Sequence, residues 1–508
     1  MREFDDLKPA EKVDLTLSKN IYENLEKFEA FLGESSDIII RKFKLGLNEI
    51  PCAVVFVDGL IDKEIVNNHI LKSFMCQVTI LEENRNRPID NTQAFEEVKE
   101  HVISIGEIEE VSTLKEAMHS VLSGDVVIII DGFNKFIAVS AKGWASRGIT
   151  EPEGEVTIRG AREGFTETIR FNTALLRRRC KDPNFVIKST KIGRRSNTDI
   201  SYAYIRGVAN PKFITELERR LSNIDIDAIL DSGQVEQLIQ DDYLTPFPQI
   251  QATERPDKAI ANIFEGRIVI LVDNSPFALI VPATFQQFFQ SPDDYSERWM
   301  FGSIIRFLRW MASFFAVLTP GIYIAIASFH PGFIPTDLAI SVAASRATVP
   351  FPVFVEAILM EITIELLRES GARLPKPIGS TISIVGAIII GDASVRAGIA
   401  SPIMVIIVAI TAISSFIIPT YSLSMTIRML RFPVMILAAI LGIYGVILGF
   451  IIIFSHLVTL KSFGVDYFIP QAPMYLREWR DYILRLPIQT QKFRPESLDP
   501  LDKKRKKD

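Results

Sequence analysis

The chain of 508 residues contains little of what disulfide, redox and metal chemistry require. It has three cysteines, Cys52, Cys76 and Cys180, which lie too far apart to form a metal-type C-x-x-C pair. We interpret them as reduced packing residues, as is typical of a reducing compartment. Of the five histidines, His330 and His456 stand alone in the apolar half of the chain. The sequence therefore predicts no metal site and no cofactor.

Nucleotide-binding and catalytic signatures are also absent. No G-x-x-x-x-G-K-[ST] loop occurs, and no predicted strand is followed by G-x-G-x-x-G. No nucleophile is accompanied by a base, and the only acids in an apolar setting share one predicted helix. The formal net charge of −5 gives no reason to expect nucleic acid as a partner. We expect the protein not to be an enzyme.

The N-terminus lacks the charged-then-apolar pattern of a secretory signal, so we expect the N-terminal domain to be cytoplasmic. The first part of the chain is rich in Asp, Glu, Lys and Arg, whereas the long aliphatic runs follow it. Because one core usually organises about 100–150 residues, several units are expected. The predicted divisions are a soluble domain at 1–245, a docking linker with a β-hairpin at 246–300, a membrane domain at 301–460 and a cytoplasmic-type tail at 461–508.

Three segments of the soluble half share one design, a buried strand that ends in Asp and a turn residue. They are 52–59, 126–132 and 268–274. The second and third are followed by another apolar run, which predicts β-hairpins because Asp-Gly and Asp-Asn tolerate positive φ. Asn210-Pro211 predicts the start of a helix, since Asn caps and Pro suits the first position. We predict an α+β or α/β region of two small subdomains, followed by an α-helical multi-pass membrane domain.

Two basic clusters in the soluble half allow two interpretations each. The glycine-rich stretch 159–165 can cradle an anion through backbone N–H groups, or it is a tight connection held by salt bridges. The run Arg177-Arg-Arg-Cys-Lys181 ends a helix that starts near Glu167. Its cations suit the negative end of the helix dipole, or they bind phosphate or a partner.

Hydropathy predicts three spans, at 303–329, 401–419 and 433–456, each close to the roughly 20 residues that a crossing helix needs. We expect a fourth helix to carry an acidic stripe, and a re-entrant or interfacial element around 378–398. Positive charges near the spans do not settle the topology. The basic run 503–507 contacts anionic lipid or is a solvated, disordered end.

The acidic stripe is the most informative feature of the apolar half. On a helix, Glu361 and Glu365 lie four residues apart on one face, with Arg368 three residues further on. Ionisable residues at membrane depth usually face a bundle interior, a cavity or an ion path. The helix is therefore either a pore-lining or gating helix, or an amphipathic helix at the membrane interface. A pore lined by so few carboxylates requires a ring of copies, so we expect a homo-oligomer.

Several stretches occur together and in order, and they carry a resemblance. They are 159–167, 246–257, 272–277, 291–295, 356–368 and 485–487. Through these stretches, taken together and in this order, the chain resembles the A subunit family of bacterial spore germinant receptors, the GerA type. The resemblance covers roughly 150–490, and it lies in the ordered set rather than in any one catalytic motif.

The resemblance implies a subunit of a nutrient receptor in the spore inner membrane, acting with a transporter-like B subunit and a lipoprotein C subunit. The A-type subunit then couples nutrient sensing to the release of monovalent cations, as an oligomeric ligand-gated channel. The alternatives are a coupling scaffold without a pore, and a paralogue associated with the SpoVA transport system. The resemblance makes the following residues pore-lining or gating candidates: Glu356, Glu361, Ile362, Thr363, Glu365 and Arg368. Docking or interface candidates are Arg255, Asp257, Asp293 and Asp294.

Overall fold

The structure is a computed structural model that describes residues 16–85, 94–103, 105, 107–143, 151–152, 154–373, 386 and 389–506. It divides into two compact units. The N-terminal unit comprises Met1–Asp241, Ile250–Pro282 and Gln491–Asp508. The helical unit comprises Asp242–Gln249 and Ala283–Thr490. The expected linker and tail are therefore each shared between the two units.

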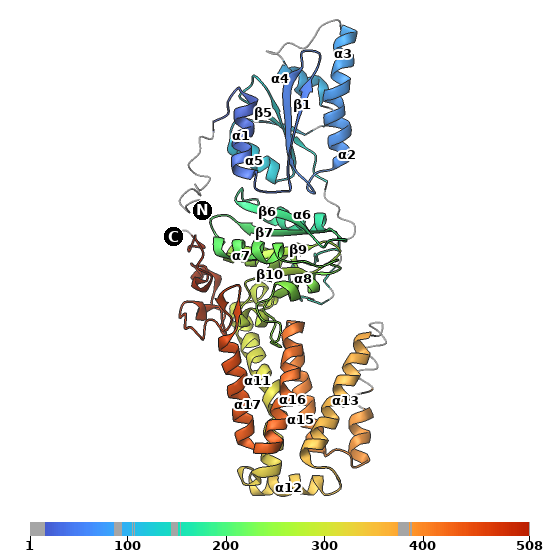
Figure 1. Ribbon diagram of the computed structural model, residues 1–508, viewed down its shortest axis with the longest axis vertical. Helices are drawn as coiled ribbons and strands as arrows, with labels where there is room; N and C mark the ends of the chain where they lie inside the picture. Colours follow the sequence, from blue (N-terminus) through green and yellow to red (C-terminus); the bar gives the residue numbers. More distant parts are fainter. Residues whose placement is uncertain are drawn as a thin grey trace. The chain divides into compact units, whose positions relative to one another are not determined.

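The N-terminal unit contains two five-stranded sheets, one in each α/β subdomain (Figure 1). The first sheet has the strand order β1-β2-β4-β5-β3, and the second has the order β6-β7-β9-β10-β8. Both orders follow the same pattern, and every pairing is antiparallel. The α/β character predicted for this region is confirmed, and the two subdomains share one topology.

The first sheet and its helices have these bounds: α1 Ile21–Leu32, β1 Ile38–Leu45, β2 Ile50–Val57, α2 Lys63–Ile65, α3 Val78–Arg85, α4 Ala94–Glu97, β3 Ile108–Val111, α5 Leu114–Leu122, β4 Asp125–Ile130 and β5 Phe136–Ser140. The second subdomain has these: α6 Ile169–Arg179, β6 Phe185–Ile192, β7 Thr198–Ile205, α7 Pro211–Ser222, α8 Ser232–Ile239, β8 Gln251–Thr253, α9 Pro256–Glu265, β9 Ile268–Val272 and β10 Ala278–Val281. The helix predicted after Asn210 is α7, and Asn210 caps it.

The recurring aspartate has the same role in both subdomains. Asp131 Oδ1 accepts a hydrogen bond of 2.9 Å from the backbone N–H of Ile21, the first residue of α1. Asp273 Oδ1 accepts one of 3.1 Å from Ile169, the first residue of α6. In each case the next residue has a positive φ, of 92° and 66°. The predicted hairpins are confirmed, and each turn also satisfies one of the free N–H groups at a helix start.

Strand β4 is apolar almost throughout because helices cover both faces of the first sheet. Val126 and Ile128 face one core, and Val127 and Ile129 face the other. Helices α1 and α5 contribute to the second core, whereas the segment from α2 to α3 contributes to the first (Figure 1). A strand buried on both faces lacks the polar alternation of a half-exposed strand.

The basic run lies in the last turn of α6, and Arg179 donates to the Leu175 carbonyl of that turn at 3.1 Å, as the capping interpretation predicted. Arg177 is buried, and its guanidinium donates to Asp37 at 2.9 and 2.8 Å, which joins the two subdomains. Phosphate binding is therefore wrong for Arg177, because its buried guanidinium is occupied by Asp37. Arg178 and Arg179 pair with Glu163, so the connection at 159–165 is held by salt bridges, as one interpretation predicted.

The cysteines form no disulfide among the described residues. Cys52 and Cys180 are buried, and burial raises the pKa of both thiols. Cys76 is exposed, because it lies on the outward side of the helical segment Ser73–Gln77. The prediction of a packing role is therefore wrong for Cys76.

The C-terminal end folds onto the second α/β subdomain. Leu501 N donates to Val208 O at 3.1 Å, and Asn210 Nδ2 donates to Asp499 O at 3.2 Å. Residues 491–506 therefore belong to the same compact unit as the N-terminal sheets. Lys507 lies outside the described residues.

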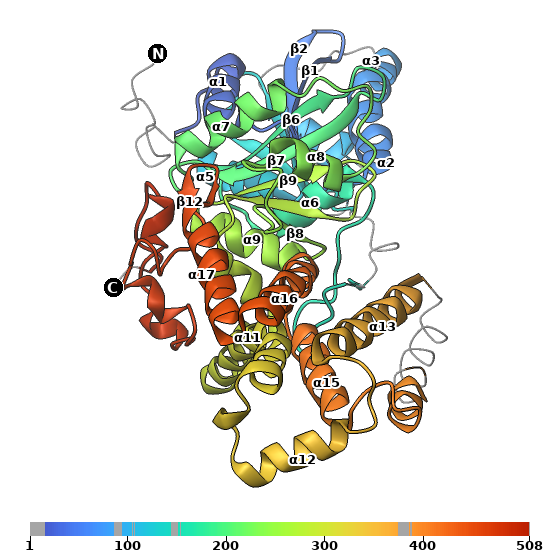
Figure 2. The same cartoon turned by 60° about the horizontal axis from the view of Figure 1, so that its bottom comes forward.

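The helical unit contains α10 Asp293–Ser296, α11 Trp299–Phe329, α12 Thr336–Arg346, α13 Val353–Arg373, α15 Pro402–Phe416, α16 Tyr421–Leu441, α17 Ile443–Thr459, β11 Lys461–Ser462 and β12 Val465–Asp466. Helix α11 contacts α15, α16 and α17, and α13 lies beside α15 (Figure 2). Among the described residues, α11 and α16 are long and apolar enough to cross a membrane. Helices α15 and α17 are apolar but shorter.

The spans predicted from hydropathy are only partly correct. The first coincides with α11, and the second contains the shorter α15. The prediction of one helix over 433–456 is wrong, because the chain turns at Gly442, with φ of 61°, between α16 and α17. A Cβ there would lie 3.0 Å from His330 Nε2. Much of the re-entrant element expected at 378–398 lies outside the described residues.

Candidate functional site

The acidic stripe lies on α13, so the fourth helix, which was predicted to carry this stripe, is confirmed as a helix. Glu361, Glu365 and Arg368 follow one another at four and three residues and share one face. Glu356 lies five residues before Glu361 and therefore points in another direction. The two directions lead to two separate polar sites.

Glu361 is buried against α16. Its side chain is 0% exposed, and its Oε2 lies 2.7 Å from Nη1 of Arg431, which is also 0% exposed. Neither carboxylate oxygen of Glu361 has a hydrogen bond of good geometry among the described residues, and Arg431 Nε has none either. A buried charged pair is held firmly only when hydrogen bonds satisfy its remaining atoms. This pair is neutralised but incompletely satisfied.

Glu365 lies one turn further along α13 and contacts three arginines. Its carboxylate is 3.3 Å from Arg368 and 3.3 Å from Arg428, and it also accepts from Arg431. Arg368 donates to Ser415 of α15 at 3.1 Å. We call these five ionisable residues the Glu361 cluster: Glu361, Glu365, Arg368, Arg428 and Arg431. With all groups ionised, three positive charges face two negative ones, so no carboxylate of the cluster lacks a cation.

Glu356 forms the second polar site of α13, at the start of α15. Its Oε1 accepts from the backbone N–H of Ser401 at 2.6 Å and from the Ser401 hydroxyl at 2.7 Å. Ser401 is the N-cap of α15, so the carboxylate lies at the positive end of that helix dipole. Its Oε2 lies 3.5 Å from Arg346 Nε. Glu356 therefore ties α13 to the start of α15.

The opposite face of α13 is apolar and exposed in the single chain. Its exposed residues are Val355, Leu359, Ile362 and Leu366, separated by four, three and four residues. This is the spacing of a seam that packs against another helix. Thr363 lies beside the seam, and its hydroxyl donates to the carbonyl of Leu359 in the same helix. Among the described residues, the helix thus has an anchored charged face and an exposed apolar face.

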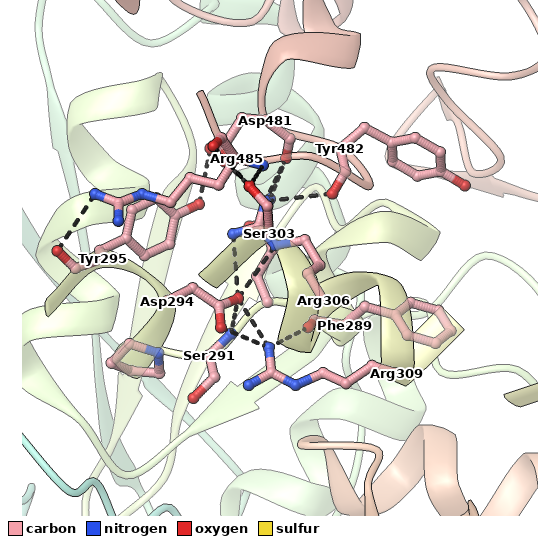
Figure 3. A network of polar contacts seen from close by, with 12 residues as sticks. Phe289, Ser291, Asp294, Tyr295, Ser303, Arg306, Arg309, Asp481, Tyr482 and Arg485 are labelled. Atoms are coloured by element: carbon pink, nitrogen blue, oxygen red, sulfur yellow. Dashed lines mark hydrogen bonds and ion pairs between the residues drawn. The ribbon is translucent and has the colours of Figure 1, made fainter. Parts of the chain in front are cut away.

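A second ion cluster lies at the start of α11 (Figure 3). Asp294, which is 2% exposed, accepts hydrogen bonds from Arg306 at 3.1 Å and from Arg309 at 2.8 Å. Arg306 also donates to the carboxylate of Asp481 at 2.8 Å. The Ser303 hydroxyl donates to the Arg485 carbonyl at 2.9 Å. We call this set the Asp294 network; it ties α10 and the start of α11 to the segment after α17.

The remaining docking candidates lie in different places. In the N-terminal unit, Arg255 is buried and donates to both oxygens of Asp257 at 3.1 and 2.7 Å. It also donates to the Ala161 carbonyl at 2.8 Å, so it holds the 155–161 stretch in place. Asp293 is the first residue of α10. The structure thus brings Asp293 and Asp294 together and holds Arg255 with Asp257 elsewhere.

Sequence reasoning missed the partners of the acidic stripe. Arg428 and Arg431 lie three residues apart in an apolar stretch, where charged side chains require partners. That requirement is a signal that could have linked them to Glu361 and Glu365. Ser401 and Arg346 carry no such signal, because the contact with Glu356 depends on packing. Among the described residues, no group of three His, Cys, Asp or Glu side chains could hold a metal ion.

Comparison with known proteins identifies the family. Residues 26–497 match the family described as Bacillus/Clostridium GerA spore germination protein. The chain belongs to this GerA family. The resemblance inferred from the ordered stretches is therefore confirmed.

Three relatives of this GerA family member are similar over nearly their whole length. The spore germination protein GerLA of Bacillus cereus is 41% identical, over 96% of this chain and 97% of its own. The spore germination protein B1 of Bacillus subtilis is 41% identical, over 96% and 99%. The uncharacterized membrane protein YfkQ of Bacillus subtilis is 43% identical, over 95% and 92%.

A solved structure also matches. The crystal structure of the N-terminal domain of the A subunit of the Bacillus megaterium spore germinant receptor GerK3 is 38% identical. The match covers 54% of this chain and 99% of the solved chain, with a TM-score of 0.43.

Proposed function

We propose that this protein is a subunit of a spore nutrient germinant receptor that couples nutrient sensing to cation release, as an oligomeric ligand-gated channel. Its place is the spore inner membrane, with a transporter-like B subunit and a lipoprotein C subunit as partners. Family membership supports the germination role. The observation that carries the channel mechanism is the two-faced character of α13.

The charged face of α13 is anchored within the chain, and its apolar face is exposed in the part of the chain that the structure describes. In a ring of copies, the apolar faces of several α13 helices meet around one axis. The seam of Leu359, Ile362 and Leu366 would then form an apolar constriction, which closes a pore by excluding water. The Glu361 cluster would hold each α13 to its own α16. In this arrangement Ile362 is the gating residue and Glu361 positions the helix.

The two chain ends support a multi-pass topology. The stretch 491–506 packs in the same compact unit as the N-terminal sheets, through contacts such as Arg494 Nε to Phe264 O at 2.8 Å. The sheets and the stretch 491–506 therefore lie on one side of the membrane. The helical unit then crosses it an even number of times, and a cytoplasmic N-terminal domain implies a cytoplasmic C-terminus.

One observation favours a second candidate function, a coupling scaffold without a pore. The carboxylates Glu361 and Glu365 are paired with arginines of the same chain, so they are not free to attract cations. A scaffold in which α13 only packs against a partner subunit is consistent with that pairing. An apolar gate does not require free carboxylates, so the channel remains our first proposal.

Potassium release from spores separates the two functions. Spores that carry Ile362→Ser are compared with spores that carry Ile440→Ser, because Ile440 is an exposed apolar residue of α16 that lies outside the seam. A polar residue in an apolar constriction favours wetting, so Ile362→Ser should leak potassium without nutrient. Ile440→Ser should release potassium only after nutrient is added.

Protein levels in the spore membrane serve as the check on assembly. Equal release from the two variants and the parent, at equal protein levels, would contradict the gate and leave the scaffold. A block of nutrient-triggered release by Ile362→Ser without any leak would also contradict an apolar gate, because it would mean lost coupling.

A further inference from the structure

The segment between α17 and the C-terminal stretch exposes an unusual amount of apolar surface. Within 471–490, Met474 is 66% exposed, Leu476 is 75% exposed and Ile488 is 60% exposed. Leu484 and Trp479 are also exposed. Such a patch on a water-facing surface marks a binding surface for a membrane or another protein.

The same segment is fixed to the first turns of α11. Arg306 donates to the carbonyl and carboxylate of Asp481, both at 2.8 Å. The Tyr482 ring lies against Trp310, with 5.0 Å between ring centroids. Figure 3 shows the polar contacts of Arg306 with Asp481, Tyr482 and Asp294. Because Arg306 and Tyr482 are buried on their sides of these contacts, the segment is fixed beside the first turns of α11.

The first turns of α11 are themselves apolar and exposed. Trp299, Phe301 and Ile304 are 41%, 57% and 58% exposed. Their exposed surface and that of 471–490 therefore belong to one end of the helical unit. Trp and Tyr are enriched where a crossing helix meets the headgroup layer. Arg480, also exposed, provides a cation for lipid phosphates.

Backbone geometry limits how deep the segment lies. It is built of turns and of short 3₁₀ segments such as Glu478–Arg480. Irregular backbone exposed to lipid does not occur within the hydrocarbon core, because its polar groups would lose hydrogen bonds. The headgroup layer accepts both irregular backbone and apolar side chains.

We infer that residues 471–490 lie in the headgroup layer of the bilayer, as an interfacial collar beside the start of α11. Their exposed apolar side chains reach toward the acyl chains. This inference rests on the proposed membrane placement of α11. It goes beyond the channel proposal, since it assigns a lipid-binding role to a segment outside the crossing helices.

The test is fluorescence quenching by spin-labelled lipids, with the full chain in lipid nanodiscs. A bimane label is placed at Leu476→Cys or Ile488→Cys, in a Cys76→Ser background because Cys76 is the exposed native thiol of the described residues. Leu230→Cys is the matched control, since Leu230 is 69% exposed in the N-terminal unit. Ile322→Cys in α11 reports whether that helix is in the bilayer.

We expect lipids spin-labelled near the headgroup to quench the labels at 476 and 488, with no quenching at 230. If the label at 322 is quenched and the labels at 476 and 488 are not, the inference about the collar is wrong. The membrane placement of α11 is then still supported. If the labels at 322, 476 and 488 are all unquenched, both the collar and the membrane placement of α11 are wrong. Two collar positions are used so that misfolding of one variant does not decide the result.

Discussion

The two ion clusters of the helical unit contain the same kinds of groups but differ in how completely these are satisfied. Both oxygens of Asp294 accept hydrogen bonds, from Arg306, Arg309 and the backbone of Ser291. Glu361 is equally buried, yet neither of its oxygens has a hydrogen bond of good geometry among the described residues. The difference lies in the carboxylates, because Arg306 Nη2 of the Asp294 network also lacks a hydrogen bond of good geometry among the described residues. A carboxylate whose oxygens both accept hydrogen bonds is held more rigidly than one whose oxygens accept none.

The positions of the clusters agree with that difference. The Asp294 network joins α10 and α11 to the segment at 481–485. The Glu361 cluster joins α13 to α16, and α13 is the helix with the exposed apolar face. We infer that the first cluster is built for rigidity and the second for movement.

Loss of Asp294 should give the largest effect. Asp294→Ala leaves Arg306 and Arg309 buried with fewer partners, and removing one member of a buried ion pair typically destabilises by about 3–5 kcal/mol. We expect a large fall in the melting temperature of the detergent-purified chain. Asp293→Ala is the matched control, because Asp293 is the neighbouring acid of α10 and is less buried. Equal melting temperatures of Asp294→Ala and Asp293→Ala would contradict the rigid role of the Asp294 network.

Glu361→Gln should have a smaller effect on stability than Asp294→Ala. Arg431 retains Glu365 as a partner, so the loss should be nearer the about 1–3 kcal/mol of one unsatisfied buried group. The control is Glu369→Gln, an exposed acid on the same helix. If α13 is a moving helix, Glu361→Gln should also alter potassium release from spores. A melting loss as large as that of Asp294→Ala would mean that both clusters are rigid.

The sequence predicted the helix that carries the Glu361 cluster but not its environment. Helical spacing shows that Glu361 and Glu365 share a face, because that geometry is local. It does not show that the face meets Arg431, since that contact depends on the packing of α13 against α16. Gly442 was missed for a related reason. The residues on both sides of Gly442 are apolar, so the hydropathy profile shows one continuous segment there. The turn is visible only in the backbone conformation.

The N-terminal unit was easier to predict. Its signals are local: a strand that ends in Asp and a turn residue specifies a hairpin whatever surrounds it. The capping contacts of Asp131 and Asp273 with Ile21 and Ile169 were not predictable, because each joins residues more than a hundred positions apart. What failed in both units is the prediction of long-range polar partners.

Replacing both members of a pair should distinguish the clusters further. The double variant Glu361→Met with Arg431→Met removes the incompletely satisfied pair, and hydrophobic replacement of a buried pair is often neutral or stabilising. It should therefore melt above either single variant, with a coupling energy of about 0.5–3 kcal/mol. Asp294→Met with Arg306→Met should show no such recovery, because Arg309 remains without its carboxylate. If both double variants melted above their single variants, the proposed difference between the two clusters would be contradicted.

The smallest effect should come from the edge of the Asp294 network. The Tyr295 hydroxyl donates to Asp481 at 2.8 Å, but Tyr295 is 37% exposed and Asp481 retains Arg306. Tyr295→Phe should therefore cost at most about 0.5–1.5 kcal/mol, the net contribution of one hydrogen bond. Differential scanning fluorimetry beside Asp294→Ala measures both on one scale. A loss from Tyr295→Phe as large as that from Asp294→Ala would show that the rigidity comes from the tyrosine contact rather than from the buried carboxylate.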